Sequence, residues 1–180
     1  SADGQVLAET KTDSEGNETR EYPYGSVFSH IVGYSTAKYG ASGIESWANF
    51  NLLRSNSSIL EKTVDDVTEE KSQGDNVITT LDVALQNTAN QALGENKGAV
   101  IAMEPSTGKI LAVVSKPDFD PNTIAENWDE IVADTAGDSV LVNRATQGLY
   151  PPGSTFKLVT TLEYLRENPT TYEDYSYHCT

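Results

Sequence analysis

The sequence predicts an α+β fold, and two observations carry that prediction. Apolar residues recur at helical spacing in two segments, residues 80–93 and 155–167. Two apolar runs, Ala99–Met103 and Ile110–Ser115, flank the turn Pro105–Gly108 and predict a β-hairpin. Both helices and strands are therefore expected in one chain.

The first 54 residues predict three strands and one short helix. Val6–Ala8 and Arg20–Tyr24 are predicted as strands on either side of the turn Asp13–Asn17. Phe28–Tyr34 is an apolar run that we interpret as a third strand. A short helix is expected over Ile44–Arg54, where apolar residues share one side.

A polar, acidic stretch separates this first region from the rest of the chain. Residues 55–76 hold few apolar side chains, so we expect a linker or a mobile surface segment. The predicted domain boundary follows from this stretch. Residues 1–75 form an N-terminal region with its linker, and residues 76–180 form a second region.

The second region predicts two helices around the hairpin. Thr80 is expected to cap a helix that runs to about Leu93, where Gly94 ends it. Residues 122–133 are expected to form a loop with helical character. A last helix is predicted over Thr155–Glu167, after two prolines, which cannot lie inside a helix, and Gly153, which adds a flexible joint.

The start of this last helix holds Ser154 and Lys157, three residues apart. Residues at i and i+3 share a helix face, so the hydroxyl and the amine can point the same way. A serine hydroxyl is a poor nucleophile until a neighbouring group takes its proton, and a lysine amine with a lowered pKa can do so. Backbone N–H groups at a helix start can also stabilise negative charge on an acyl oxygen. This arrangement suits acyl transfer through a serine ester.

The spacing alone is weak support for catalysis. Ser-x-x-Lys also occurs at Ser35 and Lys38, in a segment predicted as loop, and at Ser106 and Lys109, in the hairpin turn. The competing interpretation of Ser154 is a plain N-cap, the commonest task of a serine at a helix start. Helix context favours the third pair without deciding between the two interpretations.

Residues 150–157, Tyr-Pro-Pro-Gly-Ser-Thr-Phe-Lys, resemble the active-site serine segment of the penicillin-binding proteins, the serine transpeptidases of bacterial wall synthesis. Other segments resemble the same family in the same order: residues 77–82, 98–112, 115–122 and 143–145. Upstream, residues 20–25 and 43–45, with His30 and Gly33, resemble the non-catalytic region of the class B, monofunctional members.

The resemblance implies a function and a site. Ser154 would be the nucleophile and Lys157 the general base of a D-Ala-D-Ala transpeptidase. Its partners would be the peptidoglycan stem peptide, β-lactams that mimic it and other cell-wall synthesis proteins, and no cofactor is implied. Residues 1–75 would form a pedestal or dimerisation-type region, and residues 76–180 the first helix, hairpin and active-site helix of the transpeptidase domain, with its sheet incomplete.

The sequence also departs from the family. Ser-x-Asn and Lys-Thr-Gly, its two further motifs, do not occur in these 180 residues. We therefore expect an N-terminal piece of a longer enzyme that is not competent by itself, and self-association through the open edge of its unfinished sheet. The alternative function is a non-catalytic module of the same fold, either a β-lactam sensor or a scaffold for wall synthesis.

Composition narrows the possible partners. The 27 acidic and 12 basic residues give a formal net charge of −15, which argues against binding to nucleic acid or anionic lipid. No apolar run approaches the roughly 20 residues that span a membrane. From the resemblance we expect the extracytoplasmic face of the bacterial membrane, with an anchor upstream of Ser1. Two histidines predict no metal site, and the single cysteine, Cys179, is either a free thiol or the partner of a downstream cysteine.

Overall fold

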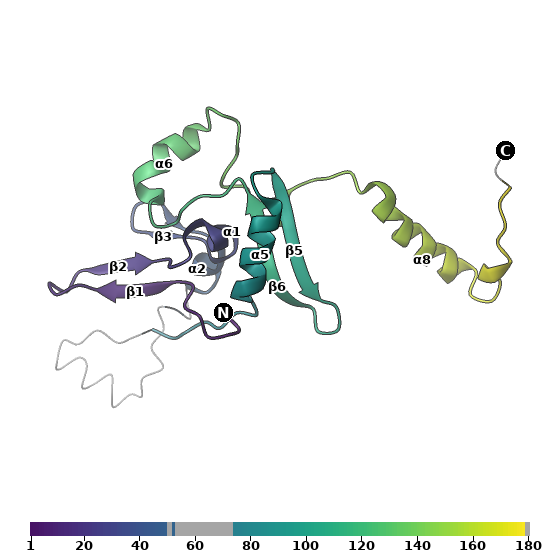
Figure 1. The fold of residues 1–180 in the computed structure, drawn as a ribbon, viewed down its shortest axis with the longest axis horizontal. Coiled ribbons are helices and arrows are strands. Elements are labelled where there is room, and N and C mark those ends of the chain that lie inside the picture. The colour runs from purple at the N-terminus through teal and green to yellow at the C-terminus, as the bar shows by residue number, and fades with distance from the viewer. Residues whose placement is uncertain (50–51, 53–73, 179–180) are drawn as a thin grey trace. The chain divides into compact units, whose positions relative to one another are not determined.

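The computed structural model describes residues 1–49, 52 and 74–178 (Figure 1). The chain divides into two compact units, Ser1–Gly148 and Leu149–Thr180. The described part of the first unit contains helices and three two-stranded antiparallel sheets, so the predicted α+β class is confirmed. The second unit, as far as residue 178, contains one α-helix and short 3-10 turns. Residues 55–73 of the linker predicted over 55–76, together with Cys179, lie outside the described residues.

The first hairpin pairs β1 (Glu9–Thr12) with β2 (Glu18–Glu21) around the expected turn. The Asp13 carboxylate accepts hydrogen bonds from the backbone N–H groups of Glu15 and Asn17, which closes the turn. The predicted strand at Val6–Ala8 is wrong in position, because the strand lies directly after this segment, at Glu9–Thr12. Pairing stops where Glu21 meets Glu9, because the next N–H, that of Tyr22, donates to the Asn122 side chain instead.

The predicted third strand, Phe28–Tyr34, is wrong. This segment forms a 3-10 turn, η1 (Gly25–Phe28), followed by the one-turn helix α1 (Ser29–Val32). Phe28 and Val32 lie four residues apart, and both are buried in the same cluster, which requires helical rather than alternating geometry. The apolar run is thus a buried helical turn.

Three short elements follow α1. β3 (Ser35–Thr36) pairs with β4 (Gly40–Ala41), and α2 spans Gly43–Trp47. The predicted helix over Ile44–Arg54 is therefore present at its start, while residues 50–51 and 53–54 lie outside the described part. Glu45 of α2 is buried, and its carboxylate lies 2.8 Å from Nε of Arg20.

The second region begins with α5 (Val83–Leu93), which starts later than predicted. Asp82, rather than Thr80, caps the helix, because its carboxylate accepts the N–H of Leu85 at 2.7 Å. The Thr80 hydroxyl is engaged elsewhere and donates to the carbonyl of Ile110 at 2.6 Å. Gly94 ends the helix as expected.

The predicted hairpin is confirmed as β5 (Gly98–Glu104) and β6 (Lys109–Lys116), with a register irregularity between Ala102 and Met103. Helix α5 lies along it (Figure 1). Their shared core contains Ala89 of α5 with Ala112 and Val114 of β6. Small residues at this contact let the helix approach the sheet closely.

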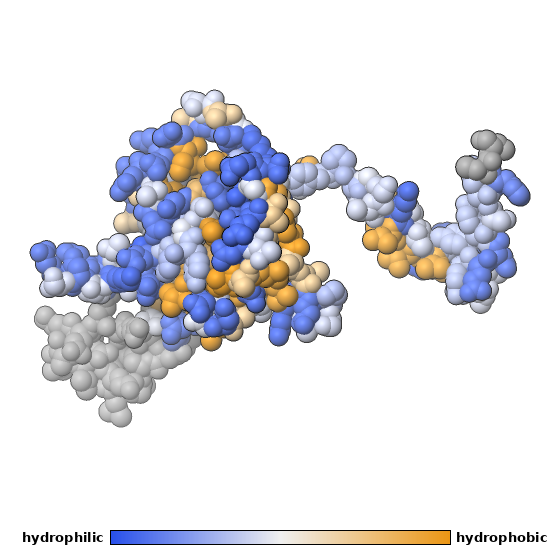
Figure 2. Space-filling model, viewed as in Figure 1, coloured by the Kyte–Doolittle hydropathy of each residue, from blue (hydrophilic) through white to orange (hydrophobic). Residues whose placement is uncertain are grey.

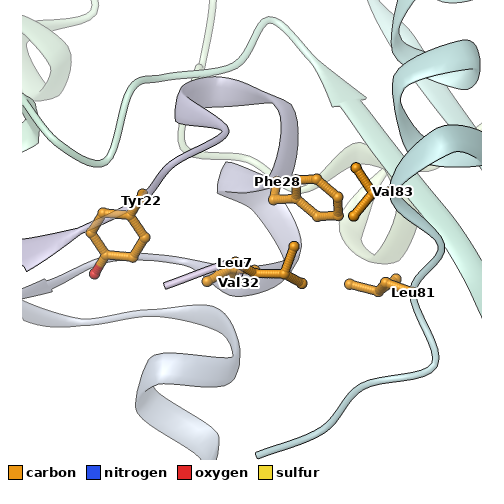
Figure 3. Close-up of a cluster of buried hydrophobic side chains, with 6 residues drawn as sticks. All are labelled: Leu7, Tyr22, Phe28, Val32, Leu81 and Val83. Carbon is orange, nitrogen blue, oxygen red and sulfur yellow. The ribbon is translucent and has the colours of Figure 1, made fainter. Parts of the chain in front are cut away.

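A buried cluster of six side chains joins the two predicted regions. Figure 3 shows its six side chains, drawn from residues 7–32 and from the segment that enters α5: Leu7, Tyr22, Phe28, Val32, Leu81 and Val83. A second cluster, around Tyr34, Phe119 and Ile124, binds α6 (Ile124–Ala133) to the N-terminal elements. The segment predicted as a loop with helical character is thus a helix of ten residues.

The chain then passes through α7 (Arg144–Gln147) to the second unit. That unit consists of η2 (Gly153–Phe156), α8 (Lys157–Glu167) and η3 (Tyr172–Asp174). Among the helices of the described residues, none is long and apolar enough to cross a membrane.

Candidate active site

Ser154 and Lys157 lie in one continuous helical turn, as the sequence indicates. Ser154 belongs to η2, and Lys157 is the first residue of α8. The backbone N–H of Lys157 donates to the carbonyl of Ser154, so a single turn separates the two residues. In such a turn, residues three apart are nearly eclipsed, which places both side chains on one face. The predicted helix end at Glu167 is also confirmed.

The local sequence explains why the helix starts here. Gly153 has φ +52°, in the left-handed region that a glycine adopts without strain. The carbonyl of Pro152 accepts both the backbone N–H of Thr155 at 3.2 Å and the Thr155 hydroxyl at 2.5 Å. Thr155, not Ser154, therefore closes the first turn with its side chain.

The Ser154 hydroxyl does not cap the helix. Neither η2 nor α8 has a side-chain cap, and the Ser154 hydroxyl has no hydrogen-bond partner among the described residues. Ser154 and Lys157 are both exposed, and the Lys157 amine makes no ion pair within the described part of the chain. The N-cap interpretation thus finds no support, and both groups are free to act on a bound molecule.

The other two Ser-x-x-Lys pairs have different settings. Ser35 lies in β3 and Lys38 in the turn that follows it, whereas Ser106 lies in a hairpin turn and Lys109 begins β6. No helical turn brings either serine beside its lysine. Only Ser154 and Lys157 have the geometry that the chemistry requires.

Helix α8 presents an apolar face to solvent within its own unit. Figure 2 shows apolar side chains gathered along it. The exposed members in α8 are Leu158, Val159, Leu162 and Leu165, and Phe156, the residue before the helix, is exposed as well. On the same helix, Glu163 and Arg166 form an ion pair, and the Tyr164 ring packs edge-on against Tyr175.

The segment that precedes Ser154 is anchored by residues that sequence reasoning singled out only through resemblance. Asn143 caps α7, and its side-chain N–H also donates to the carbonyl of His30 at 2.9 Å. The backbone N–H of Arg144 donates to the Ser115 hydroxyl at 2.9 Å. An asparagine before a short polar helix indicates an N-cap. Nothing in the sequence indicates the second hydrogen bond of Asn143, which joins it to the His30 carbonyl.

The His30 side chain makes packing and hydrogen-bond contacts within the first unit. Its ring lies edge-on to Phe119 and bonds through Nε2 with the carbonyl of Pro117 at 3.1 Å. Burial lowers the pKa of His30, while the Pro117 carbonyl and Asp118 act in the opposite direction. Within the described residues, no group of three or more His, Cys, Asp or Glu side chains could hold a metal ion.

Comparison with known families assigns both regions of the chain. Residues 98–178 match the penicillin-binding protein transpeptidase domain. Residues 1–77 match the penicillin-binding protein A dimerisation domain. The chain thus belongs to the class B penicillin-binding proteins.

Individual relatives agree with this assignment. The peptidoglycan D,D-transpeptidase PbpA of Mycobacterium tuberculosis is 37% identical over 96% of the chain, which spans 38% of that relative. The imipenem acyl-enzyme complex of penicillin-binding protein A from M. tuberculosis is 34% identical and superposes with a TM-score of 0.80. The match covers 93% of this chain and 41% of that one. A D,D-transpeptidase domain of a peptidoglycan glycosyltransferase from Eggerthella lenta is 38% identical, with a TM-score of 0.75, over 93% of this chain and 36% of that one.

Proposed function

We propose that the protein carrying this chain is a peptidoglycan D,D-transpeptidase that works through a serine acyl-enzyme. The observation that carries the proposal is the single helical turn that joins Ser154 to Lys157 and leaves both side chains exposed and unpartnered. The relative solved as an imipenem acyl-enzyme supports it, because a β-lactam forms that adduct as a mimic of the acyl donor.

In the proposed mechanism, Ser154 is the nucleophile and Lys157 the general base. The Ser154 oxygen attacks the carbonyl of the penultimate D-alanine of a stem peptide, and its proton passes to the neutral Lys157 amine. The terminal D-alanine leaves with a proton from the resulting ammonium group. An amine of a neighbouring stem peptide then attacks the ester carbonyl and gives a proton to the Lys157 amine. The bond from the carbonyl carbon to the Ser154 oxygen breaks, the amide cross-link forms, and the Ser154 oxygen takes the proton back from Lys157.

The two regions have separate tasks in this proposal. Residues 1–75 form a non-catalytic region that suits contacts with other wall-synthesis proteins, and residues 76–180 form the N-terminal part of the transpeptidase domain. The substrate places the site on the extracytoplasmic face of the membrane. Because Ser-x-Asn and Lys-Thr-Gly do not occur in these 180 residues, we infer that they do not turn over substrate alone.

The serine assignment is tested by labelling the full-length protein with fluorescent penicillin. Wild type is expected to label covalently, and Ser154→Ala to lose all label. Lys157→Arg keeps a long basic side chain, but its guanidinium stays protonated and cannot take the serine proton, so its labelling rate is expected to fall by about 10²-fold to 10⁴-fold. Ser106→Ala is the matched control, since Ser106 has the same spacing to a lysine but no shared helical turn. Full labelling of Ser154→Ala would overturn the assignment.

A second assay separates the enzyme from a sensor or scaffold. Full-length protein is supplied with a pentapeptide donor and an amine acceptor, and the release of D-alanine is measured. A transpeptidase releases D-alanine and forms the cross-linked product. A sensor takes the penicillin label yet releases none.

We also propose that the 180-residue chain by itself self-associates through the hairpin. Ile101 and Met103 of β5 are each about half exposed, at 52% and 54%, on a sheet of only two strands. A strand edge and an apolar face of this kind favour pairing with a second copy. Small-angle scattering is expected to show a mass above that of the monomer, and Ile101→Lys is expected to reduce it. A strictly monomeric wild type would contradict the proposal.

A further inference from the structure

The backbone directly before Ser154 contains a flexible joint. Gly153 has φ +52°, a conformation that a glycine enters and leaves without strain. The space beside it is open, since no heavy atom of the described residues lies within 4 Å of a Cβ built at this position. The direction of the Ser154 side chain therefore depends on what closes the turn around the serine.

Thr155 closes that turn with two hydrogen bonds to one acceptor. Its backbone N–H donates to the carbonyl of Pro152 at 3.2 Å, the usual bond of a four-residue turn. Its hydroxyl donates to the same carbonyl at the shorter distance of 2.5 Å. Pro152 is a well-defined acceptor, because its ring locks φ, here −68°. Gly153 and Ser154 lie between the two ends that these bonds join.

The hydroxyl bond adds a restraint that the backbone alone does not provide. A hydrogen bond across three residues has poorer geometry than that of an α-helix, so one such bond holds a turn weakly. On the other side of Ser154, the backbone N–H of Lys157 donates to the Ser154 carbonyl. The bond from Thr155 to Pro152 thus fixes the side of the serine that faces the glycine joint.

The same bond also keeps the Ser154 hydroxyl free. Serine and threonine hydroxyls in short turns compete for nearby backbone carbonyls. A carbonyl oxygen has two lone pairs, and the N–H and hydroxyl of Thr155 occupy both at Pro152. The Ser154 hydroxyl accordingly has no hydrogen-bond partner among the described residues.

We propose that Thr155 is a positioning residue for the acylation of Ser154, acting through the bond from its hydroxyl to the Pro152 carbonyl. The bond holds Ser154 in the turn that places its hydroxyl on the face of Lys157, and it withholds the Pro152 carbonyl from that hydroxyl. This inference rests on the proposed function and adds to it a residue that prepares the nucleophile. Loss of the bond leaves nucleophile and base in the chain but lowers the population of correctly directed serine.

The test is the kinetics of fluorescent penicillin labelling in the full-length protein. Thr155→Val keeps the size and the β-branch of threonine and removes only the hydroxyl. The first-order rate of labelling at saturating penicillin is expected to fall about fivefold, the effect of one neutral hydrogen bond. The penicillin concentration that gives half of the maximal rate is expected to stay at the wild-type value. Thr155→Ser restores the hydroxyl and is expected to restore the wild-type rate.

Thr160→Val is the matched control. The Thr160 hydroxyl donates to the carbonyl of Lys157 at 3.0 Å, also across three residues, but inside α8 rather than in the turn around Ser154. Thr160→Val is therefore expected to label at the wild-type rate.

Three results would overturn the inference: wild-type kinetics in Thr155→Val, equal slowing in Thr155→Ser, or equal slowing in Thr160→Val. The rate is read from the molecules that label, so a misfolded fraction lowers the final amount of label without mimicking the effect. Ser154→Ala tests the proposed function separately, because it abolishes labelling instead of slowing it.

Discussion

Gly33 shows how a single residue fixes the N-terminal region. It ends α1 with φ +86° and ψ −154°, a conformation open in practice only to glycine. A Cβ atom at this position would lie 2.0 Å from the backbone oxygen of Ser42. The segment before α2 therefore packs directly against the backbone of Gly33, with no room for a side chain.

Gly33→Ala is expected to destabilise the protein by about 3–5 kcal/mol or to prevent folding, because backbone strain and a backbone clash coincide. Gly40→Ala is the control. Gly40 also has a positive φ, +75°, but no atom lies within 4 Å of its would-be Cβ, so a loss of about 1–2 kcal/mol is expected. Urea unfolding measures both values. Equal losses would show that strain, not the clash, determines the effect.

His30 makes stability depend on pH. Burial lowers its pKa below the ordinary 6.5, with Arg144 acting in the same direction, and with the Pro117 carbonyl and Asp118 opposing. The unfolded chain therefore binds a proton at higher pH than the folded chain does. The contribution of neutral His30 to the free energy of unfolding is therefore fully present above pH 6.5, and it is lost as the pH falls below that value.

His30→Gln retains an N–H donor near the Pro117 carbonyl but cannot titrate. The free energy of unfolding of wild type is expected to fall more steeply between pH 7.5 and 5 than that of His30→Gln, measured by urea unfolding at each pH. Parallel curves for the two proteins would contradict the assignment of this pH dependence to His30.

Single residues also mark the limit of prediction from sequence. Ser154 and Lys157 were found because their relation is local, three positions apart on one turn. Asn143 and Asn122 have partners 113 and 100 positions away, and nothing in a local pattern reports such a bond. Only a resemblance at the level of the whole segment drew attention to them.

At the scale of elements, Gln86 joins α5 to the hairpin and to η1. Its side chain is fully buried; Nε2 donates to the carbonyls of Val27 and Val113 at 2.8 and 2.6 Å, and Oε1 accepts the Val113 N–H at 2.8 Å. The amide thus pairs with both backbone groups of Val113 in β6, much as a residue of a neighbouring strand would. Two buried backbone groups, those of Val113, and the partly buried carbonyl of Val27 depend on one side chain.

Gln86→Leu is expected to cost about 3–5 kcal/mol of unfolding free energy, because it leaves these three groups without partners in an apolar setting. Gln91→Leu places the same substitution at an exposed position of the same helix and is expected to stay within about 0.5 kcal/mol of wild type. Chemical denaturation gives both values. A small loss in Gln86→Leu would mean that water replaces the amide.

Elements with local determinants were predicted well. The β5–β6 hairpin has its turn and both apolar runs within 19 consecutive residues, and α8 has its start and period within one segment. Phe28–Tyr34 was assigned to the wrong class because a run of seven residues fits a buried helical turn as readily as a strand. The start of α5 was misplaced because Asp82 and Thr80 are both good caps, and only the bond of Thr80 to Ile110 decides between them.

At the scale of the whole molecule, the described parts of residues 1–148 share one core across the predicted domain boundary. Leu7 and Phe28 pack with Leu81 and Val83, and the second cluster joins Tyr34 to α6. The polar stretch before residue 76 indicated two regions in sequence. It could not reveal that they bury apolar surface against each other, because that contact is between distant segments.

The central claim is that Ser154 carries the acyl group, and mapping the adduct by mass spectrometry tests it most directly. Full-length protein is treated with benzylpenicillin and digested with trypsin, which cuts after Arg144 and Lys157 and yields residues 145–157 with Ser154 as the single serine. The account predicts that this peptide gains the mass of one penicilloyl group and that fragmentation places it on Ser154. A penicilloyl group on Ser35, Ser106 or any other residue, with residues 145–157 unmodified, would contradict it.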